Sequence, residues 1–362
     1  TARALAELAA SYRRSLRARV IGVTGSNGKT TVVRMIDSAL RASLTGTASP
    51  KSFNNHIGVP LTILAADERD DYLVSEVGMN APGEIAPLAR TLAPDIAIVT
   101  TIGHAHIGAF GTTDAIAREK ADILTSLAPG GLALLNGDVP ELRPIVNNRE
   151  DVEWFGEHPS NDLSIADIAT RTSLTTSFRL HDGTPWSVPA PGRHNAVNAA
   201  IAIRVARACG LRDDDIQRGL DAFAPPAMRF EPVEAGGVTF YNDAYNASPE
   251  SVRAALDTFA SLTDGTARRR VVVLGDMLEQ GDLAPLLHRE AIGHARSIEP
   301  DLLIVVGPRF TATGGADHAC DEPDAALAAH LRPGDVVLLK GSRGIGLETI
   351  IGSVRSNPTD SP

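Results

Sequence analysis

The residues with the clearest chemistry lie in the stretch VIGVTGSNGKTT, at positions 20–31. Its apolar first half predicts a buried strand over Val20–Val23, and the small residues that follow leave backbone N–H groups free to turn inward around an anion. Lys29 is placed to reach the β- and γ-phosphates of a nucleotide. The hydroxyl of Thr30 is placed to bind Mg²⁺ at the start of a helix predicted over Thr31–Leu40. The predicted phosphate loop consists of Gly25, Ser26, Asn27, Gly28, Lys29, Thr30 and Thr31.

This loop departs from the strict phosphate-loop pattern at one position. The pattern has a glycine where this chain has Val23, and Gly22 comes one residue too early. A simple glycine turn before a helix, with an incidental lysine, is the alternative interpretation. The order of strand, Gly-Lys-Thr and helix favours a variant phosphate loop.

Two further segments place chemically capable residues after predicted strands. Glu76, in YLVSEVGMN, ends a strand predicted over Tyr72–Val77. Ligands gather at that edge of open parallel sheets, so we expect Glu76 to be a second Mg²⁺ ligand. The segment TTIGHAHIGAFGTTDAIAREKADIL adds His104, His106 and Lys120. Taken singly, each of these three has an ordinary structural interpretation, because histidines often act as hydrogen-bonding groups and helix lysines usually face solvent.

Composition limits the class of protein. The 362 residues are enough for two or more domains, and the 43% hydrophobic content supports full-sized cores. The 34 Lys and Arg residues against 44 Asp and Glu residues leave a formal charge of −10, which disfavours nucleic acid as a partner. Cys209 and Cys320 suggest neither a disulfide framework nor a cysteine-rich metal site, and no apolar run reaches the length of a membrane span. We therefore expect a cytoplasmic protein.

Alternating strand and helix patterns predict an α/β first domain. Helical segments such as Thr112–Leu127 separate the strand-like runs, which favours a mostly parallel sheet with helices on both faces. Around Ser173–Val188 a short polar and apolar alternation with an Asp-Gly turn predicts a small antiparallel sheet. Helical patterns also cover Thr1–Leu16 and Ala196–Ala208. The expected parallel strands are Val20–Val23, Tyr72–Val77, Ile96–Thr100 and Leu132–Leu135.

A second alternating series follows the pair Pro225-Pro226. We place a domain boundary near Asp221–Arg229, which gives an ATP-binding domain over 1–222 and a Rossmann-like α/β domain over 223–362. In the second domain, VVVLGDMLEQGDL predicts a strand followed by a substrate-side loop and a helix. We interpret His288, in that helix, as structural. The expected strands lie near Val238–Tyr241, Val271–Leu274, Leu302–Val306 and Val336–Leu339.

The order of motifs along the chain resembles that of a known enzyme family. The motifs are TGSNGKTT, NNHIGVPLT, SEVGMNAPGEI, TTIGHAHIGAFGT, AREKADIL, LLNGD, GRHNAVNAAIA, YNDAYNASPESV, VLGDMLEQG and LLKGSRGIGLE, between residues 24 and 348. This series is similar to that of the Mur ligases. The stretches FNNHIGVPLTIL, DAYNASP and KGSRG are most similar to the branch that joins D-alanyl-D-alanine to UDP-N-acetylmuramoyl-tripeptide, rather than to its siblings or to folylpolyglutamate synthase.

The resemblance implies a role for each matching residue of the first domain. Lys29 matches the phosphate-binding lysine, and Thr30, Glu76 and His106 match metal-site residues. Lys120 matches a lysine that CO₂ commonly carbamylates, which would turn a cation into a carboxylate-like ligand of one of two Mg²⁺ ions. Such a reaction needs a neutral amine, so we expect Lys120 to be partly desolvated. Other matching positions are His194 and Asn195 at the adenine end of ATP, and Asn54 and Asn55 at the substrate.

The resemblance extends to the second domain. Arg229 matches an arginine that reaches the phosphates of ATP, and Asp243 matches a nucleotide contact. The remaining matching residues are expected to contact the incoming amine or the rest of the substrate; they are Tyr245, Asn246, Lys340, Ser342 and Arg343.

The implied reaction is ATP-dependent amide formation. A carboxylate is a poor electrophile, so the γ-phosphate of ATP is first transferred to it, which gives an acyl phosphate and ADP. The amine then attacks the acyl carbon and phosphate leaves. Lys29, Glu76, His106 and Lys120 are the expected catalytic residues. We expect domain closure about the Asp221–Arg229 hinge to exclude water from the acyl phosphate.

Several alternatives follow from the same sequence. Ligases of this branch begin with a domain that holds the UDP end of the substrate, and no segment here matches it. The chain is therefore either a trimmed cell-wall ligase or a short relative that joins a small acid without UDP to an amine in specialised metabolism. A regulatory ATP-binding protein and a switch or motor ATPase are the other two hypotheses. In each ligase case we expect ATP, Mg²⁺, a monomer and no nucleic acid.

Overall fold

The computed structural model describes residues 1–146, 149–323 and 325–356. The chain forms two compact units, Thr1–Ala224 and Pro225–Pro362, and they divide two residues after the boundary expected between 222 and 223. In those described ranges, none of the helices has the length and apolar character needed to cross a membrane.

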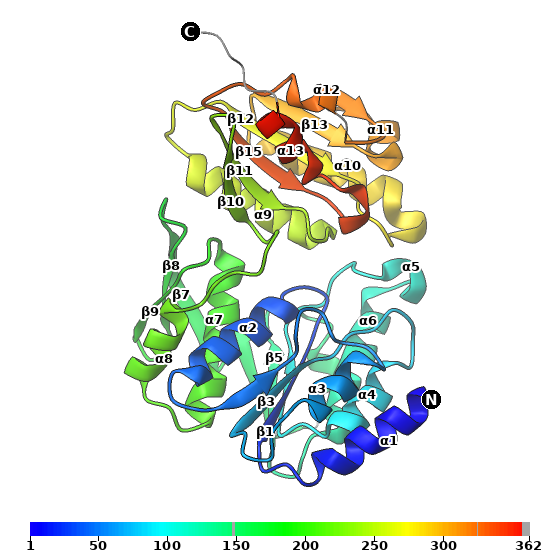
Figure 1. Cartoon of the computed structure of the whole chain (residues 1–362), viewed down its shortest axis with the longest axis vertical. Helices are drawn as coiled ribbons and strands as arrows, with labels where there is room; N and C mark the ends of the chain where they lie inside the picture. The colour runs from blue at the N-terminus through cyan, green and yellow to red at the C-terminus, as the bar shows by residue number, and fades with distance from the viewer. Residues whose placement is uncertain (147–148, 324, 357–362) are drawn as a thin grey trace. The chain divides into compact units, whose positions relative to one another are not determined.

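The first unit is built on one nine-stranded sheet (Figure 1). Each neighbouring pair among the first seven strands of the sheet is parallel. The two remaining pairs, β7 with β8 and β8 with β9, are antiparallel. In spatial order the strands are β2 (Gly46–Ala48), β3 (Tyr72–Glu76), β1 (Arg19–Thr24), β4 (Ile96–Val99), β5 (Leu132–Asn136), β6 (Val152–Gly156), β7 (Leu163–Thr170), β8 (Thr176–Leu180) and β9 (Pro185–Val188). The predicted mostly parallel sheet with a small antiparallel extension is confirmed.

Helices cover both faces of this sheet, because residues of a buried parallel strand alternate between two cores. Ile21 and Val23 of β1 belong to one hydrophobic cluster and Val20 to the other. The helices are α1 (Ala2–Arg13), α2 (Lys29–Arg41), α3 (Gly58–Leu64), α4 (Ile85–Leu92), α5 (Ile107–Phe110), α6 (Thr113–Ala121), α7 (Arg193–Ala208) and α8 (Asp213–Asp221), with 3₁₀ turns η1 (Asp122–Ser126) and η2 (Arg143–Ile145). The single helix predicted over 112–127 is wrong, because the chain tightens into η1 after Ala121, as helix ends often do.

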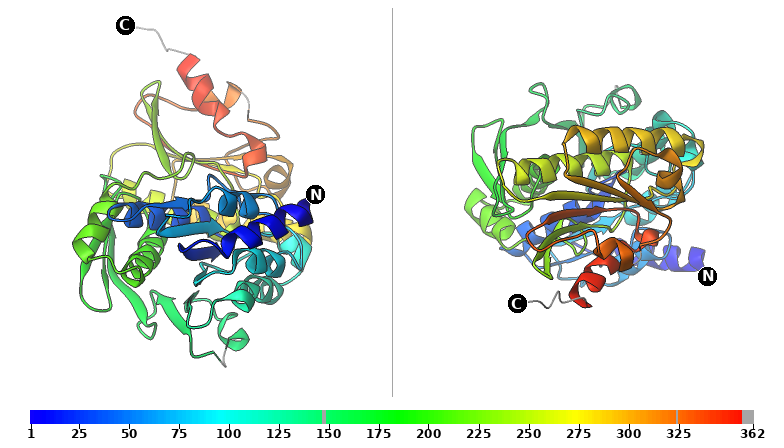
Figure 2. Two further views of the ribbon diagram at one scale, coloured as in Figure 1. Left: turned by 60° about the horizontal axis from the view of Figure 1, so that its bottom comes forward. Right: turned by 90° about the horizontal axis from the view of Figure 1, so that it is seen from above.

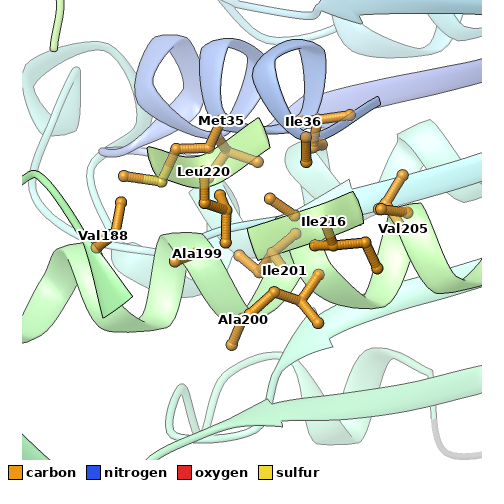
Figure 3. Packing of buried hydrophobic residues seen from close by; sticks show 14 of the residues in the cluster. Met35, Ile36, Val188, Ala199, Ala200, Ile201, Val205, Ile216 and Leu220 are labelled. Atoms are coloured by element: carbon orange, nitrogen blue, oxygen red, sulfur yellow. The ribbon is translucent and has the colours of Figure 1, made fainter. Parts of the chain in front are cut away.

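One of the two cores lies where α2, α7 and α8 meet (Figure 3). Met35 and Ile36 of α2 pack there with the small side chain of Ala199 from α7. A Cβ at Gly219 of α8 would lie 2.5 Å from the carbonyl oxygen of Ser38. Any side chain at position 219 would collide with the backbone of α2, so the close crossing of α8 and α2 requires glycine there. This packing anchors the helix that begins at the phosphate loop.

The second unit has a six-stranded sheet with helices on both faces (Figure 2, right). All of its strand pairs are parallel except β10 with β11. In spatial order the strands are β10 (Glu231–Ala235), β11 (Val238–Asp243), β15 (Val336–Lys340), β12 (Arg270–Gly275), β13 (Leu302–Val306) and β14 (His318–Cys320). The helices are α9 (Pro249–Thr263), α10 (Ala284–Ser297), α11 (Pro308–Thr313), α12 (Ala325–Ala328) and α13 (Thr349–Ser356), with η3 (Gly281–Leu283) and η4 (Arg343–Ile345). The predicted Rossmann-like α/β fold is confirmed.

Helix α1 is attached to the first unit by a partly buried arginine. Nε of Arg13 donates to the carbonyl oxygen of Leu92 at 3.0 Å, and Nη2 donates to that of Ala93 at 3.0 Å and to the carboxylate of Asp95 at 3.1 Å. These carbonyl groups belong to the end of α4, where helices leave acceptors unpaired. Arg13 thus caps α4 and ties α1 to the sheet through Asp95.

Replacing this arginine should destabilise the first unit. We expect Arg13→Met to lower the free energy of unfolding by about 2 kcal/mol, because it leaves two carbonyl groups without their donor and the half-buried carboxylate of Asp95 without its ion pair. Urea unfolding followed by circular dichroism measures the change. The matched control is Arg14→Met, because Arg14 is exposed. Equal midpoints for the two variants would contradict the capping role of Arg13.

Candidate active site

The phosphate loop begins where β1 ends and needs glycine at two positions. Gly25 has φ +147°, and a Cβ there would lie 1.9 Å from Oγ1 of Thr100. Gly28 caps α2 with φ +85°, and its Cβ would lie 3.0 Å from Oδ1 of Asn198. Val23 is buried within β1 and pairs with β3, so the sharp turn begins only after the strand. This placement explains why the chain has valine where the strict pattern has glycine.

Thr100 and Thr101, which follow β4, form hydrogen bonds with the backbone of the phosphate loop. The N–H of Ser26 donates to the carbonyl oxygen of Thr101 at 2.7 Å, and the N–H of Asn27 donates to its hydroxyl at 2.9 Å. The hydroxyl of Thr100 donates to the carbonyl oxygen of Asn27 at 2.5 Å. Nζ of Lys29 donates to the carbonyl oxygen of Gly25 at 2.8 Å, so the lysine folds back over the loop. Sequence reasoning missed Thr100 and Thr101, although a polar pair after the neighbouring strand was a usable signal.

Glu76 is brought to the loop by strand register. Strands β1 and β3 are parallel, and Val23 lies opposite Glu76. The side chain of Glu76 is 1% exposed; Oε2 accepts from the hydroxyl of Thr30 at 2.7 Å, and Oε1 accepts from Nδ2 of Asn54 at 2.8 Å. Gly78 leaves room for that amide, since a Cβ there would lie 2.6 Å from Asn54. Three residues singled out by the sequence therefore form one hydrogen-bonded group.

Lys120 lies on α6 and is buried, with 1% of its surface exposed. Its amine makes no ion pair with any residue in the described part of the chain. Burial lowers the pKa of Lys120 well below its ordinary value, the positive charge of Lys29 lowers it further, and Glu119 opposes the shift. Oxygens of Glu119 accept from the N–H groups of Gly83 at 2.8 Å and Ile85 at 2.9 Å. Glu119 thereby attaches the segment that follows Glu76 to the helix that carries Lys120.

The remaining residues predicted in the first unit have different local settings. His104 and His106 lie in the segment after β4, and His106 has φ +65° at the start of α5. His194 and Asn195 lie in the first turn of α7. Oδ1 of Asn55 accepts from the N–H groups of Ile57 and Gly58, so this side chain caps α3.

Asn195 forms a hydrogen bond with a second asparagine of α7, Asn198. Its Nδ2 donates to the carbonyl oxygen of Pro191 at 2.7 Å, and its Oδ1 accepts from Nδ2 of Asn198 at 3.2 Å. Asn198 in turn lies against Gly28. This chain of contacts connects the start of α7 to the phosphate loop, and sequence reasoning did not single out Asn198.

In the second unit, strand register pairs two predicted residues. Asp243 ends β11 and lies opposite Lys340, which ends β15. Nζ of Lys340 lies 2.8 Å from Oδ2 of Asp243 and donates to the carbonyl oxygens of Asp243 at 3.2 Å and Asn246 at 2.7 Å. Burial lowers the pKa of Lys340, and the carboxylate of Asp243 opposes this shift. The ammonium group of Lys340 therefore stabilises the loop that follows β11.

The other predicted residues of this unit gather at the same edge of its sheet. The guanidinium of Arg229 lies 4.6 Å from the ring centroid of Tyr245. Oγ of Ser342 accepts from the N–H of Leu278 at 3.0 Å, and Arg343 contacts Met228 and pairs with Glu348 at 2.9 Å. Asn246 is exposed.

The donor set of the first unit fits Mg²⁺. Within residues 1–146, 149–323 and 325–356, no group of three or more His, Cys, Asp or Glu side chains is placed to hold a metal ion, as a soft or multi-histidine site would require. Mg²⁺ prefers oxygen ligands and uses few protein groups beside substrate phosphates. The hydroxyl of Thr30 and the carboxylate of Glu76, in contact with each other, supply such oxygens.

The first unit combines a phosphate loop with the buried side chains of Glu76 and Lys120, and the chain continues into a Rossmann-like unit. This combination is typical of an ATP-dependent ligase. Residues 23–206 match the family model described as Mur ligase middle domain, and residues 228–343 match the model described as Mur ligase, glutamate ligase domain. The chain belongs to the Mur ligase family, and it is an ADP-forming enzyme that uses ATP and Mg²⁺.

Relatives of known name match nearly the whole chain. The UDP-N-acetylmuramoyl-tripeptide–D-alanyl-D-alanine ligase of Bacillus subtilis is 35% identical over 99% of this chain and 80% of its own. The enzyme of that name from Mycobacterium tuberculosis is 32% identical over 98% and 77%. Among solved structures, MurF from Acinetobacter baumannii has a TM-score of 0.90 at 29% identity, covering 99% of this chain and 81% of that one. MurF from Thermotoga maritima in complex with ADP has a TM-score of 0.88 at 26% identity, covering 98% and 83%.

A side chain at position 25 should prevent nucleotide binding. We expect Gly25→Ala to lower ATP affinity at least about ten-fold, because the methyl group must displace Thr100 and with it the bond to Asn27. Isothermal titration calorimetry measures the affinity. Gly130→Ala is the control, because Gly130 also has positive φ but has open space around it. An unchanged ATP affinity in Gly25→Ala would refute the assignment of this loop.

Proposed function

We propose that this enzyme joins D-alanyl-D-alanine to UDP-N-acetylmuramoyl-tripeptide, a step of peptidoglycan precursor synthesis. The observation that carries the proposal is the likeness, over 97–99% of this chain, to curated enzymes with that name. The likeness includes the second unit, in which the amine is expected to bind. We assign ATP binding to the unit Thr1–Ala224 and amine binding to the unit Pro225–Pro362.

The first unit activates the acid. The N–H groups of the loop around Gly25–Gly28 and the ammonium of Lys29 hold the phosphates of ATP. An oxygen of the substrate carboxylate attacks the γ-phosphorus, the bond to the β–γ bridging oxygen breaks, and ADP and an acyl phosphate form. Lys29 stabilises the charge that develops on the transferring group, because its position beside the loop is set before the reaction.

Thr30 and Glu76 are the residues that would hold Mg²⁺, and we assign His106 and a carbamylated Lys120 to a second ion. Bound Mg²⁺ supplies positive charge against the phosphate and acyl oxygens. Carbamylation joins the neutral amine of Lys120 to CO₂ with loss of one proton, so the product is a carbamate anion. The burial of Lys120 and its lowered pKa support this assignment, because only the neutral amine reacts.

The second unit presents the amine and completes ATP binding. We assign Arg229 and Asp243 to the nucleotide, and Tyr245, Asn246, Ser342 and Arg343 to the substrate. Lys340 acts through the loop it holds, because its ammonium already contacts three acceptors there. The neutral amine attacks the acyl carbon, and the tetrahedral intermediate expels inorganic phosphate and releases one proton. The new C–N bond replaces the C–O bond of the acyl phosphate.

We propose that the enzyme works as a monomer in the cytoplasm, where ATP is available. Cys209 and Cys320 form no disulfide among the described residues, which is compatible with a reducing compartment.

Product formation is the direct test. We expect the purified chain, with ATP, Mg²⁺, UDP-N-acetylmuramoyl-tripeptide and D-alanyl-D-alanine, to form the pentapeptide product and one ADP per product, as measured by mass spectrometry and a coupled ADP assay. Release of ADP only with other acid and amine pairs would reassign the substrate to a small acid. Absence of both ADP and product with every pair would refute the ligase mechanism.

Loss of the buried amine should abolish turnover without loss of the fold. We expect Lys120→Met to lower kcat at least about 10³-fold, because the proposed carbamate cannot form. The wild-type enzyme should lose activity in CO₂-depleted buffer and regain it on addition of bicarbonate, and Lys120→Met should respond to neither. A bicarbonate-independent wild-type enzyme would contradict carbamylation while leaving the ligase assignment in place.

A further inference from the structure

The carboxyl ends of β12 and β15 form a topological switch point in the second unit. After β12 the chain enters α10, which packs beside α9, whereas after β15 it enters α13, whose residues pack with the opposite faces of these strands. Figure 2 (right) shows α9 and α10 on one side of the sheet and α13 on the other. Open α/β sheets bind ligands in the crevice between strands that diverge in this way. The segments that follow these two strands are the loop Asp276–Gln280 and Ser342–Arg343.

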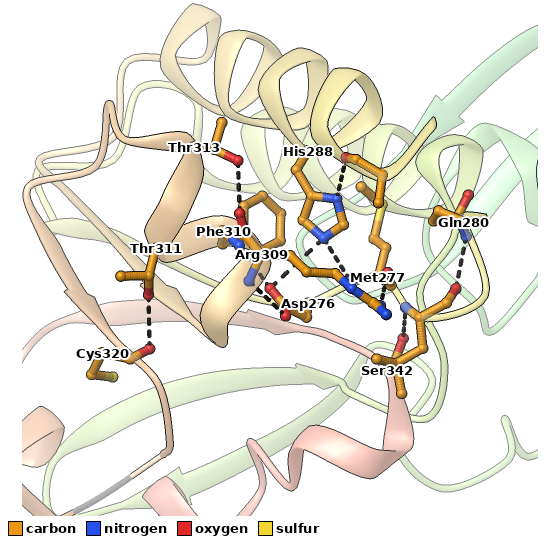
Figure 4. A network of polar contacts seen from close by, with 12 residues as sticks. Asp276, Met277, Gln280, His288, Arg309, Phe310, Thr311, Thr313, Cys320 and Ser342 are labelled. Carbon is orange, nitrogen blue, oxygen red and sulfur yellow. Dashed lines mark hydrogen bonds and ion pairs between the residues drawn. The ribbon is translucent and has the colours of Figure 1, made fainter. Parts of the chain in front are cut away.

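Hydrogen bonds fix most backbone polar groups of the residues Asp276–Leu278 in the loop Asp276–Gln280 (Figure 4). The N–H of Asp276 donates to the carbonyl oxygen of Val306 at 2.9 Å, and its carbonyl oxygen accepts from the N–H of Ser342 at 3.2 Å. The carbonyl oxygen of Met277 accepts from Nη1 of Arg309 at 3.1 Å. The carboxylate of Asp276 accepts from the N–H groups of Arg309 at 3.0 Å and Phe310 at 2.8 Å. The loop therefore has one defined shape.

His288 supplies a buried contact to the backbone of this loop. Its side chain is 0% exposed, and Nδ1 lies 2.7 Å from the carbonyl oxygen of Ala284. Since a carbonyl oxygen only accepts, Nδ1 carries the proton, and Nε2 accepts from the N–H of Met277 at 3.1 Å. The ring of Phe310 packs against His288 with a centroid distance of 4.4 Å and an interplanar angle of 68°. A neutral imidazole with this one tautomer satisfies both contacts.

The hydrogen bonds of this loop fix the backbone of Leu278, a large apolar residue that is partly exposed to solvent. Leu278 is 36% exposed, and a Cβ at Gly344 would lie 3.3 Å from its Cδ1. Its N–H is bound by Ser342, and its carbonyl oxygen accepts from Nε2 of Gln280 at 2.9 Å. Gln280 is 1% exposed, and its Oε1 has no hydrogen-bond partner among the described residues. An exposed leucine fixed at the switch point of the sheet suits a substrate with small apolar groups.

We propose that His288 is a positioning residue for the second substrate: it fixes the loop so that Leu278 forms an apolar wall of the crevice that receives the methyl groups of a dipeptide amine. This inference rests on the proposed function, and it adds a specificity-determining residue, Leu278, and a residue that acts through it. The charged groups facing His288 are Asp276, 3.7 Å from Nε2, and Arg309.

The test is steady-state kinetics with D-alanyl-D-alanine as the varied substrate. We expect Leu278→Ala to raise KM for the dipeptide about five- to ten-fold with an unchanged melting temperature and an unchanged KM for ATP. His288→Leu should raise the dipeptide KM by at least as much, since it leaves the N–H of Met277 unpaired. His288→Gln should recover part of the loss, because its amide contains both a donor and an acceptor. The matched control, His294→Gln, alters a histidine of the same helix that pairs with Asp257 at the surface and should change neither KM.

A pH profile separates positioning from mere stability. Burial lowers the pKa of His288 below its ordinary value, so the neutral ring is kept until the pH falls below the usual histidine range, where protonation of Nε2 removes the acceptor for Met277. The dipeptide KM of the wild-type enzyme should rise there, relative to its KM for ATP, and this rise should be absent in His288→Leu. Equal dipeptide KM values for the wild-type enzyme, Leu278→Ala and His288→Leu would overturn the inference. A wild-type enzyme that forms no pentapeptide product would instead overturn the proposed function on which it rests.

Discussion

The parallel pairing of β1 with β3 is the constraint on which the first unit depends. It places Val23 opposite Glu76, so that the chain leaves both strands at one edge of the sheet and the carboxylate meets the hydroxyl of Thr30 at 2.7 Å. A shift of register by one residue would reverse the direction of the Glu76 side chain and remove it from the loop. The neighbouring strand β4 ends with the threonines that hold the loop. Three adjacent strand ends thus bring the phosphate loop, Glu76 and the two threonines together.

In the second unit, too, the register of parallel strands brings two side chains together at the strand ends. Asp243 and Lys340 end adjacent strands in register and form a buried ion pair that holds a loop. The next strand in the sheet, β12, ends in the segment that His288 fixes. In the first unit the buried amine is that of Lys120 on α6, and it makes no ion pair within the described residues. In the second unit the buried amine of Lys340 is paired with Asp243. This difference is the physical basis for assigning reaction chemistry to Lys120 and a positioning role to Lys340.

Much of this arrangement was accessible from the sequence. The alternation of apolar runs and helices predicted both α/β units, because buried parallel strands require long apolar runs and crossover helices. Glu76 was expected at the loop from its place at the carboxyl end of a predicted strand. The helix over 112–127 was predicted as one element and is two, because no local signal marks the change to a 3₁₀ turn after Ala121. The capping of α3 by Asn55, which the sequence places only as a substrate residue, also needed the structure.

By itself, the sequence determined the chemistry: a Gly-Lys-Thr loop, a carboxylate after a strand, a lysine in AREKADIL and motifs typical of the Mur ligases. Whether these groups are buried, paired or fixed depended on how the helices and strands pack. The lowered pKa of Lys120, the contact of Thr100 with Gly25 and the single tautomer of His288 each depend on residues far away in the chain. Burial and hydrogen-bond geometry arise when strands and helices pack, and no local pattern of residues specifies them.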